Sequence, residues 1–489
     1  MTARPRPLAL ALSLALAGVG LAAGCRDAPP KSSPRKSPAG TPGSTPGGSP
    51  GATAKTPVDP GAAQDKAAPA VEISVPPDPG PPPAPPAPTR SFTCAEATVI
   101  GGDGRAPSSR EAPADGARLP ESPPFPWRGV SAGEDALYVT SGYELRRVVD
   151  AGGAPVLHRV AGENQAQTGA VRFRAGVPCA EARFSGLGKP ALLSDGSVVV
   201  PDISSNAVVR VVHPDDAERC YVHYVSGTSD DMAQRSDENR PPKQIPAEGL
   251  VGTRFPNPGN GDGDYRQARH NQPTLTAVIR DRIYVLEHDY QHRSGRLLRR
   301  IELAPDSGRA RAVTTVARFD DVDSAFGLSA LGPRVYVAVV EDDHGVVYEL
   351  DPDTGARREV IRGDKAAWSS PKHRPLLLAG LSPCGGFLCT WAGHRVFAVN
   401  PRSGALIAIA GAGNKSERGG DFTTFTSSYE LRAATPALAA ELPLHSGAAA
   451  TRGFLVGLAY DDDDDELWLS AETRRSPYLV RITGCAPAR

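Results

Sequence analysis

The chain has 489 residues, with 54 basic and 55 acidic side chains and a formal net charge of −1. This balance, together with the lack of a basic stripe with interleaved aromatics, argues against a nucleic-acid-binding protein. The 49 prolines are unevenly distributed, and they divide the chain into a leader, a tether and a folded part.

The leader, Met1–Gly24, predicts a secretory signal, because two arginines precede a Leu/Ala-rich run and a small-residue end. Cys25 follows Ala-Gly and so resembles the cysteine of the bacterial lipobox, which is lipidated and becomes the mature N-terminus. We therefore expect a lipoprotein held on a membrane of the bacterial cell envelope, on the periplasmic or surface face of the outer membrane. An ordinary signal peptide with an incidental cysteine is the alternative.

The tether is Cys25–Arg90. Its residues 26–90 contain 19 of the chain's 49 prolines and no aromatic residue. Such a composition cannot bury a core, so we expect a disordered Pro/Gly/Ser-rich linker between membrane and domain. Contact with peptidoglycan, or a proline-motif ligand, is a further interpretation of this stretch.

The folded part, Ser91–Arg489, repeats a β-meander pattern. In Phe184–Val212, two apolar runs flank an Asp-Gly turn, and a third run, Ala207–Val212, follows a polar turn. Middle strands of the same character recur, making six with Ser197–Pro201: Ala136–Thr140, Arg282–Leu286, Arg334–Ala338, Phe387–Trp391 and Glu466–Ser470. Six meanders of up to four strands predict an all-β, six-bladed β-propeller of four-stranded antiparallel blades.

These units resemble the NHL repeat, within the TolB-like and NHL propeller superfamily. NHL-like chains often carry a Pro-Ala-x-x-Ala-x-Leu turn between blades, and this chain has such turns at Pro113–Leu119, Pro178–Phe184 and Pro436–Leu442. The resemblance implies one monomeric ring. An irregular β-sandwich is the alternative fold.

The even number of cysteines beyond Cys25 predicts three disulfides in an exported chain. If an N-terminal strand completes the last blade, as the propeller resemblance implies, Cys94 and Cys485 lie on neighbouring strands and close the ring. Cys384 and Cys389 bracket a Gly-Gly turn. Cys179 and Cys220 remain as the third pair, although Cys220 could lie at the other end of its blade.

Two acidic stretches are candidates for weak calcium binding. Asp262 and Asp264 alternate with glycines as in a calcium loop, but Tyr265 stands where the EF-hand pattern needs Gly. Asp461, Asp463 and Asp465 belong to a run of six carboxylates in a predicted turn, which repel one another and would gain from a cation. A solvated turn is the simpler interpretation, and otherwise no cofactor is expected.

Further candidates for chemistry are few. His288–His292 holds two imidazoles and a carboxylate, but it falls in a turn between strands and predicts a solvated loop. Enzymes built on six-bladed propellers, such as lactonase-like and lyase-like families, gather Asp, Glu, Asn or His at the central channel from the innermost strands. Here these strands, for example Lys189–Leu192, are poor in them. No Ser-His-Asp arrangement is visible either.

Two classes of function follow. The first is a non-catalytic propeller that binds a protein or glycan ligand, with the insert Thr228–Gln272 shaping one face. The second is a metal-assisted lactonase- or lyase-like enzyme acting at the central funnel.

Overall fold

The computed structural model describes residues 92–101, 114–119, 128–150, 155–163, 177–184, 186–227, 259–265, 267–289, 295–320, 322, 324–342, 344–363, 378–392, 395–411, 435–439, 457–472 and 477–487. All of them belong to one unit, Pro79–Arg489. The expected leader, Cys25 and the expected tether lie outside the described residues. Within these ranges, no helix has the length and hydrophobicity of a membrane span.

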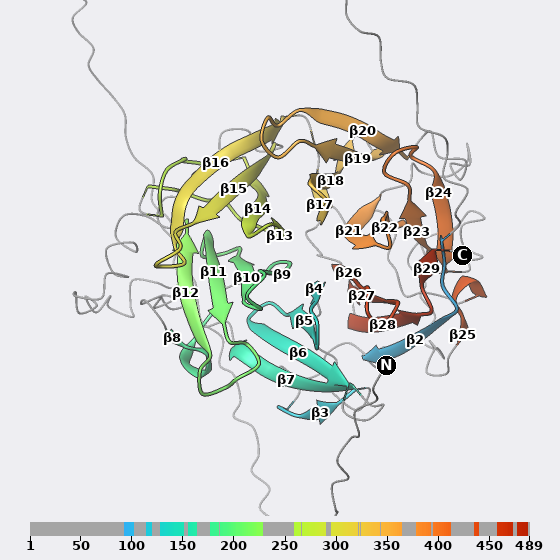
Figure 1. The fold of residues 1–489 in the computed structure, drawn as a ribbon, viewed down its shortest axis with the longest axis horizontal. Helices are drawn as coiled ribbons and strands as arrows, with labels where there is room; N and C mark the ends of the chain where they lie inside the picture. The colour runs from blue at the N-terminus through green and yellow to red at the C-terminus, as the bar shows by residue number, and fades with distance from the viewer. Residues whose placement is uncertain are drawn as a thin grey trace, which may run out of the picture. The chain divides into compact units, whose positions relative to one another are not determined.

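Six antiparallel sheets are arranged as blades around a ring, which confirms the predicted six-bladed β-propeller (Figure 1), and one further pair of short strands lies outside the blades. Each blade runs outward from an innermost strand. Blade 1 contains β4 (Gly129–Ala132), β5 (Leu137–Thr140), β6 (Glu144–Asp150) and β7 (Pro155–Gly162). Blade 2 contains β9 (Ala191–Leu192), β10 (Val198–Asp202), β11 (Ala207–Val212) and β12 (Tyr221–Ser226). Blade 3 contains β13 (Leu275–Ile279), β14 (Arg282–His288), β15 (Arg296–Leu303) and β16 (Ala310–Phe319). Blade 4 contains β17 (Ser324–Leu331), β18 (Arg334–Glu341), β19 (His344–Leu350) and β20 (Arg357–Arg362). Blade 5 contains β21 (Ala379–Cys384), β22 (Phe387–Ala392), β23 (Arg395–Val399) and β24 (Leu406–Ala410). Blade 6 contains β26 (Gly457–Asp461), β27 (Glu466–Glu472), β28 (Pro477–Thr483) and β2 (Glu96–Gly101).

Three blades have a fifth, short strand on the outer edge. The strands β3 (Ala117–Arg118), β8 (Val177–Pro178) and β25 (Thr435–Pro436) pair with β7, β12 and β2. They coincide with the three Pro-Ala turns of the sequence, two of which continue into short 3-10 helices, η1 (Cys179–Glu181) and η4 (Ala437–Ala439). The turn therefore covers an outer edge that would otherwise offer unpaired backbone groups.

The core lies between neighbouring blades, because each sheet is covered on both faces. Every residue of β10 and of β22 is buried. A strand buried on both faces needs no alternation of polar and apolar residues, which is why the middle strands appear in the sequence as nearly continuous apolar runs. The turns between strands supply the polar residues, such as Asn206, which adopts a φ of 52° at the β10–β11 turn.

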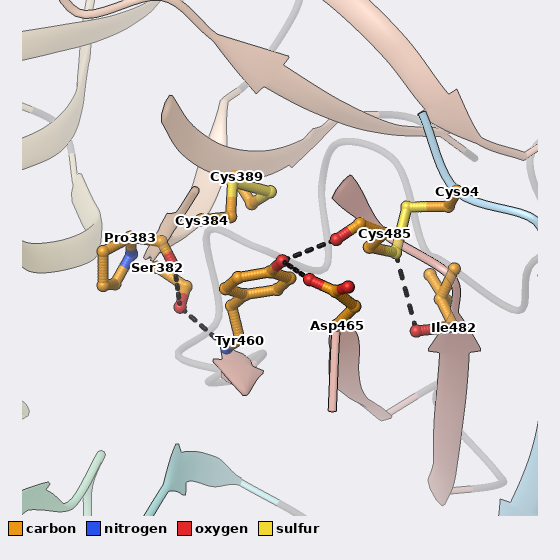
Figure 2. Close-up of a disulfide and its surroundings, with 9 residues drawn as sticks. All are labelled: Cys94, Ser382, Pro383, Cys384, Cys389, Tyr460, Asp465, Ile482 and Cys485. Atoms are coloured by element: carbon orange, nitrogen blue, oxygen red, sulfur yellow. Dashed lines mark hydrogen bonds between the residues drawn. A yellow bond between two sulfur atoms is a disulfide. The ribbon is translucent and has the colours of Figure 1, made fainter. Parts of the chain in front are cut away.

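Blade 6 closes the ring by combining strands from both ends of the domain. The N-terminal β2 pairs with β28, and β1 (Phe92–Thr93) pairs with β29 (Ala486–Pro487). A Cys94–Cys485 disulfide, with a sequence separation of 391, joins the two ends. Beside it, the Tyr460 hydroxyl lies 2.5 Å from Cys485 O and 3.1 Å from Asp465 Oδ1, so its one O–H faces two acceptors, as Figure 2 shows.

The remaining disulfides are the other two pairs expected from the sequence. Cys179–Cys220 ties η1 to the residue before β12, where Cys179 N also donates to Cys220 O at 3.0 Å. Cys384–Cys389 bridges the Gly-Gly turn between β21 and β22. Cys220 therefore lies at the same end of its blade as Cys179.

Candidate functional site

One side chain reaches across the centre of the ring. Lys189, just before β9 of blade 2, donates from Nζ to the main-chain oxygens of Leu328 (2.9 Å) and Leu381 (2.7 Å). Leu328 lies on the innermost strand of blade 4 and Leu381 on that of blade 5. In the ring of six, blade 5 lies opposite blade 2 (Figure 1). A side chain of blade 2 that contacts blade 5 therefore passes through the centre.

The backbone of Lys189 is held in place by its neighbours in blade 3. Lys189 N donates to Thr274 O at 2.9 Å, and Thr276 Oγ1 donates to Lys189 O at 2.6 Å. The approach is close enough to require glycine nearby: a Cβ on Gly188 would lie 2.0 Å from Thr274 O, and one on Gly129 would lie 2.5 Å from Lys189 Cα. The amine therefore projects from a fixed base.

The electrostatic environment of Lys189 is unusual for a lysine. Burial lowers the pKa of its amine from the ordinary value of 10.5 to about 8. The residue as a whole is nevertheless half-buried rather than sealed. An amine that is closely surrounded by protein, on a residue that is still partly open to solvent, is expected deep in the central space of a propeller. Near pH 8 this amine is thus present in both its charged and its neutral form.

A second polar cluster lies at the same end of the ring. The innermost strand of each blade begins at this end, and the second and fourth strands finish there. Ser226 ends β12, the fourth strand of blade 2, and Glu287 lies near the end of β14, the second strand of blade 3, so the two residues meet beside His270. Ser226 Oγ is 3.0 Å from His270 Nε2, and His270 Nδ1 is 2.5 Å from Glu287 Oε2. None of the three side chains has accessible surface.

Glu287 also holds the second half of the insert that precedes blade 3. Its Oε1 accepts hydrogen bonds from Asn260 Nδ2 and from Arg299 Nη1, both at 2.7 Å. Arg299 Nη2 in turn donates to Gly261 O (2.8 Å) and Asp262 Oδ1 (2.9 Å). The cluster thus clamps residues 259–270 between blades 2 and 3. The first part of the insert, from residue 228 to 258, lies outside the described residues.

The Ser226–His270–Glu287 set is triad-like in its contacts, although the sequence shows no Ser-His-Asp arrangement with a nucleophile elbow. Its distances match those of a nucleophile, a base and an orienting carboxylate. A catalytic serine must reach a substrate, however, and here all three groups are sealed while Glu287 is shared with Arg299. The set therefore serves as an internal clamp. Sequence patterns did not reveal it because its members come from three distant segments with no motif around them.

Four of the five carboxylates proposed as calcium ligands accept hydrogen bonds from protein groups. Asp262 is paired with Arg299 and Thr315, and Asp264 Oδ1 accepts from Gln267 N at 3.1 Å. In the acidic turn, Asp461 Oδ1 accepts from Asp463 N and Asp465 accepts from Tyr460. Burial and neighbouring carboxylates raise the pKa of Asp461 and Asp462. Among the residues described, no three histidine, cysteine or carboxylate side chains converge as metal ligands would.

The expected solvated loop at His288–His292 is wrong for its first residues. Asp289 is buried, and its Oδ2 accepts from Arg318 Nη1 at 3.0 Å. Burial, with a contribution from Arg296, lowers the pKa of His288 to about 4, so this imidazole is neutral at physiological pH. Residues 290–292 lie outside the described ranges. Asp289 is thus part of the packed blade and does not belong to a solvated loop.

No protein-family model matches the chain, and no curated protein does either. Among solved structures, the chain is similar to a gluconolactonase from Xanthomonas campestris, with 13% identity, a TM-score of 0.41, and coverage of 82% of this chain and 98% of that one. It is also similar to an auxiliary nutrient binding protein from Bacteroides thetaiotaomicron, with 9% identity, a TM-score of 0.46, and coverage of 81% and 76%. Identities of this size do not indicate a shared substrate. The six-bladed ring itself rests on the strand pairings above.

Proposed function

We propose that this propeller is a non-catalytic binding domain whose ligand, part of a protein or of a glycan, enters the ring at the end that bears Lys189. The observation that carries the proposal is the amine at the centre, which is fixed by carbonyl oxygens of blades 4 and 5. An ammonium has three N–H donors, so beyond its two carbonyl partners it can donate one more hydrogen bond to a ligand oxygen, and its charge can attract an anionic group.

The enzyme alternative requires a cation held by carboxylate or imidazole ligands at the centre. A metal ion placed beside Lys189 would be repelled by the ammonium and would find the oxygens of Leu328 and Leu381 already engaged. This positive charge, together with the engaged carboxylates elsewhere, favours the binding role over a metal-assisted lactonase or lyase.

Metal analysis of the purified mature chain tests this choice. We expect no stoichiometric ion and a melting temperature that is unchanged by dialysis against a chelator. Ligand screening by thermal shift should then find compounds that raise the melting temperature saturably without being converted. Replacing Lys189 with methionine should weaken such binding. A tightly held ion whose removal abolishes turnover of a lactone would establish the enzyme instead.

We further propose that lipid on Cys25 and the tether display the domain on an envelope membrane as a monomer. The support is the small-residue sequence before Cys25 and the proline content of the following segment. Mature protein should fractionate with membranes, whereas Cys25→Ala should release it or block its maturation. Membrane-bound mature Cys25→Ala protein would contradict the anchor.

A further inference from the structure

The choice of lysine at the ring centre is selective. The chain contains nine lysines and 45 arginines, and only Lys189 lies in the part of the chain that the structure describes. The ion pairs of the blades use arginine, as in Arg299–Glu287 and Arg481–Glu466. Arginine is the more effective donor to several acceptors, but its guanidinium keeps its proton and is not a nucleophile. The centre therefore holds a kind of cation that the described blades use nowhere else.

The contacts of Nζ fit a neutral amine as well as an ammonium. A neutral primary amine has two N–H donors and one lone pair, and the oxygens of Leu328 and Leu381 accept two hydrogen bonds. With both N–H groups directed to these oxygens, the lone pair is directed away from them. Lys189 is half-buried rather than sealed, so the proposed ligand would approach along the part of this residue that is open to solvent.

We propose that Lys189 attaches a small aldehyde or ketone reversibly, through an imine at Nζ. This inference rests on the proposed binding role and names the chemical class of the ligand. The nitrogen lone pair attacks the carbonyl carbon, and a C–N bond forms. The carbonyl oxygen takes up both amine protons and leaves as water, so no oxidant or reductant is needed. Protonation of the imine gives an iminium whose single N–H can still donate to Leu328 O or Leu381 O.

Two features of the site favour this step. Burial lowers the pKa of Lys189 to about 8, which increases the fraction of nucleophilic amine at neutral pH. Its hydrogen-bond acceptors are carbonyl groups, which stabilise the iminium by their dipoles but do not form the strong ion pair that a carboxylate would. The amine is thus positioned without being held permanently in its charged form.

The magnitude of the effect can be worked out from the two pKa values. At pH 7.5 the neutral fraction of an amine of pKa about 8 is about 200 times that of a lysine of pKa about 10.4. Lower basicity also reduces nucleophilicity, and a Brønsted coefficient of about 0.5, the size known for thiols, lowers the advantage to about tenfold. We therefore expect Lys189 to react about tenfold faster than an exposed lysine.

The test is reductive trapping on the full mature chain. The protein is incubated at pH 7.5 with glycolaldehyde and cyanoborohydride for short times, and alkylation of each lysine is quantified by peptide mass spectrometry. Lys243, Lys365, Lys372 and Lys415 serve as internal references. Trapping at Lys189 should exceed the mean of the references about tenfold, and its pH profile should have a midpoint near 8. Trapping at Lys189 that equals or falls below the references would overturn the proposal.

A matched variant separates this inference from the binding role. Lys189→Arg keeps a cation with N–H donors but removes the nucleophilic amine, and its circular dichroism spectrum shows whether the ring is retained. A carbonyl ligand should lose its slow, borohydride-trappable binding in this variant. A ligand that raises the melting temperature of both proteins equally would refute the imine and leave the binding role intact. If Lys189→Arg does not fold, the pH profile of the wild-type protein alone decides.

Discussion

Removal of the disulfide at the ring closure should destabilise the domain more than removal of either other disulfide. In the chain-entropy model the stabilisation grows with the logarithm of the loop length. A separation of 391 residues for Cys94–Cys485 then corresponds to about 6 kcal/mol. The separations of 41 and 5 for the other pairs correspond to about 4 and about 2 kcal/mol. The two shorter loops lie inside the long one, but they shorten it by only a small fraction, so the stabilisation expected from the long loop hardly changes.

The assay is equilibrium unfolding in guanidinium chloride under non-reducing conditions, with three variants that each replace one pair by alanine. The native ring should persist without the Cys94–Cys485 bond because β2 stays paired with β28 and β25. The far-UV circular dichroism spectrum should therefore be unchanged in all variants. Peptide mapping under the same conditions verifies that the two remaining pairs are intact in each.

Loss of packing predicts a different order, which makes the experiment decisive. Cys384 and Cys389 have no accessible surface, whereas Cys94 is only half-buried. If the alanine variants lost stability chiefly through cavities, the Cys384–Cys389 variant would suffer at least as much as the Cys94–Cys485 variant. That result would refute the reasoning from loop length, and with it the view that the bond acts mainly on the unfolded chain.

Three further predictions concern buried polar groups. Glu287→Gln should destabilise the domain by about 3–5 kcal/mol in denaturant unfolding, because it leaves the buried guanidinium of Arg299 without the carboxylate charge of Glu287. Asp262→Asn removes the exposed carboxylate that pairs with the same guanidinium and should cost under about 1 kcal/mol. His288, with a pKa lowered to about 4, should contribute stability that is complete above about pH 6.5 and is lost as the pH falls toward 4, and an NMR titration of its imidazole checks this. Tyr460→Phe should cost about 1–2 kcal/mol in the same unfolding assay, since it leaves the buried oxygen of Cys485 without its hydroxyl donor.

Most of the fold could be predicted because propeller blades leave a direct trace in sequence. The middle strands are covered on both faces, so all six stand out as apolar runs such as Phe387–Trp391. Closure could also be predicted, since Cys94 and Cys485 flank strands that match in character. The short outer strands were not foreseen. A two-residue pairing such as β8 with β12 has no periodicity of its own and depends on an edge formed elsewhere.

The buried clamp was hidden for a different reason. Ser226, His270 and Glu287 meet because a fourth strand, an inter-blade segment and a second strand finish at the same end of the ring. Each looks ordinary in its own stretch, and only the antiparallel order of the blades makes them neighbours. The candidate calcium residue Asp262 also has partners from distant segments. Arg299 and Thr315 of blade 3 donate to its Oδ1, and calcium binding at this residue stays a prediction.

The position of Lys189 has no sequence signature, because the groups that hold its amine are backbone oxygens. Any residue at positions 328 and 381 supplies the same carbonyl, so no motif could mark the partners of Nζ. What selects these oxygens is the radius of the ring: with six blades, the innermost strands of blades 4 and 5 come within reach of one extended lysine side chain from blade 2. More blades would widen the centre and leave the amine without these acceptors. The number of blades therefore sets the chemistry at the centre.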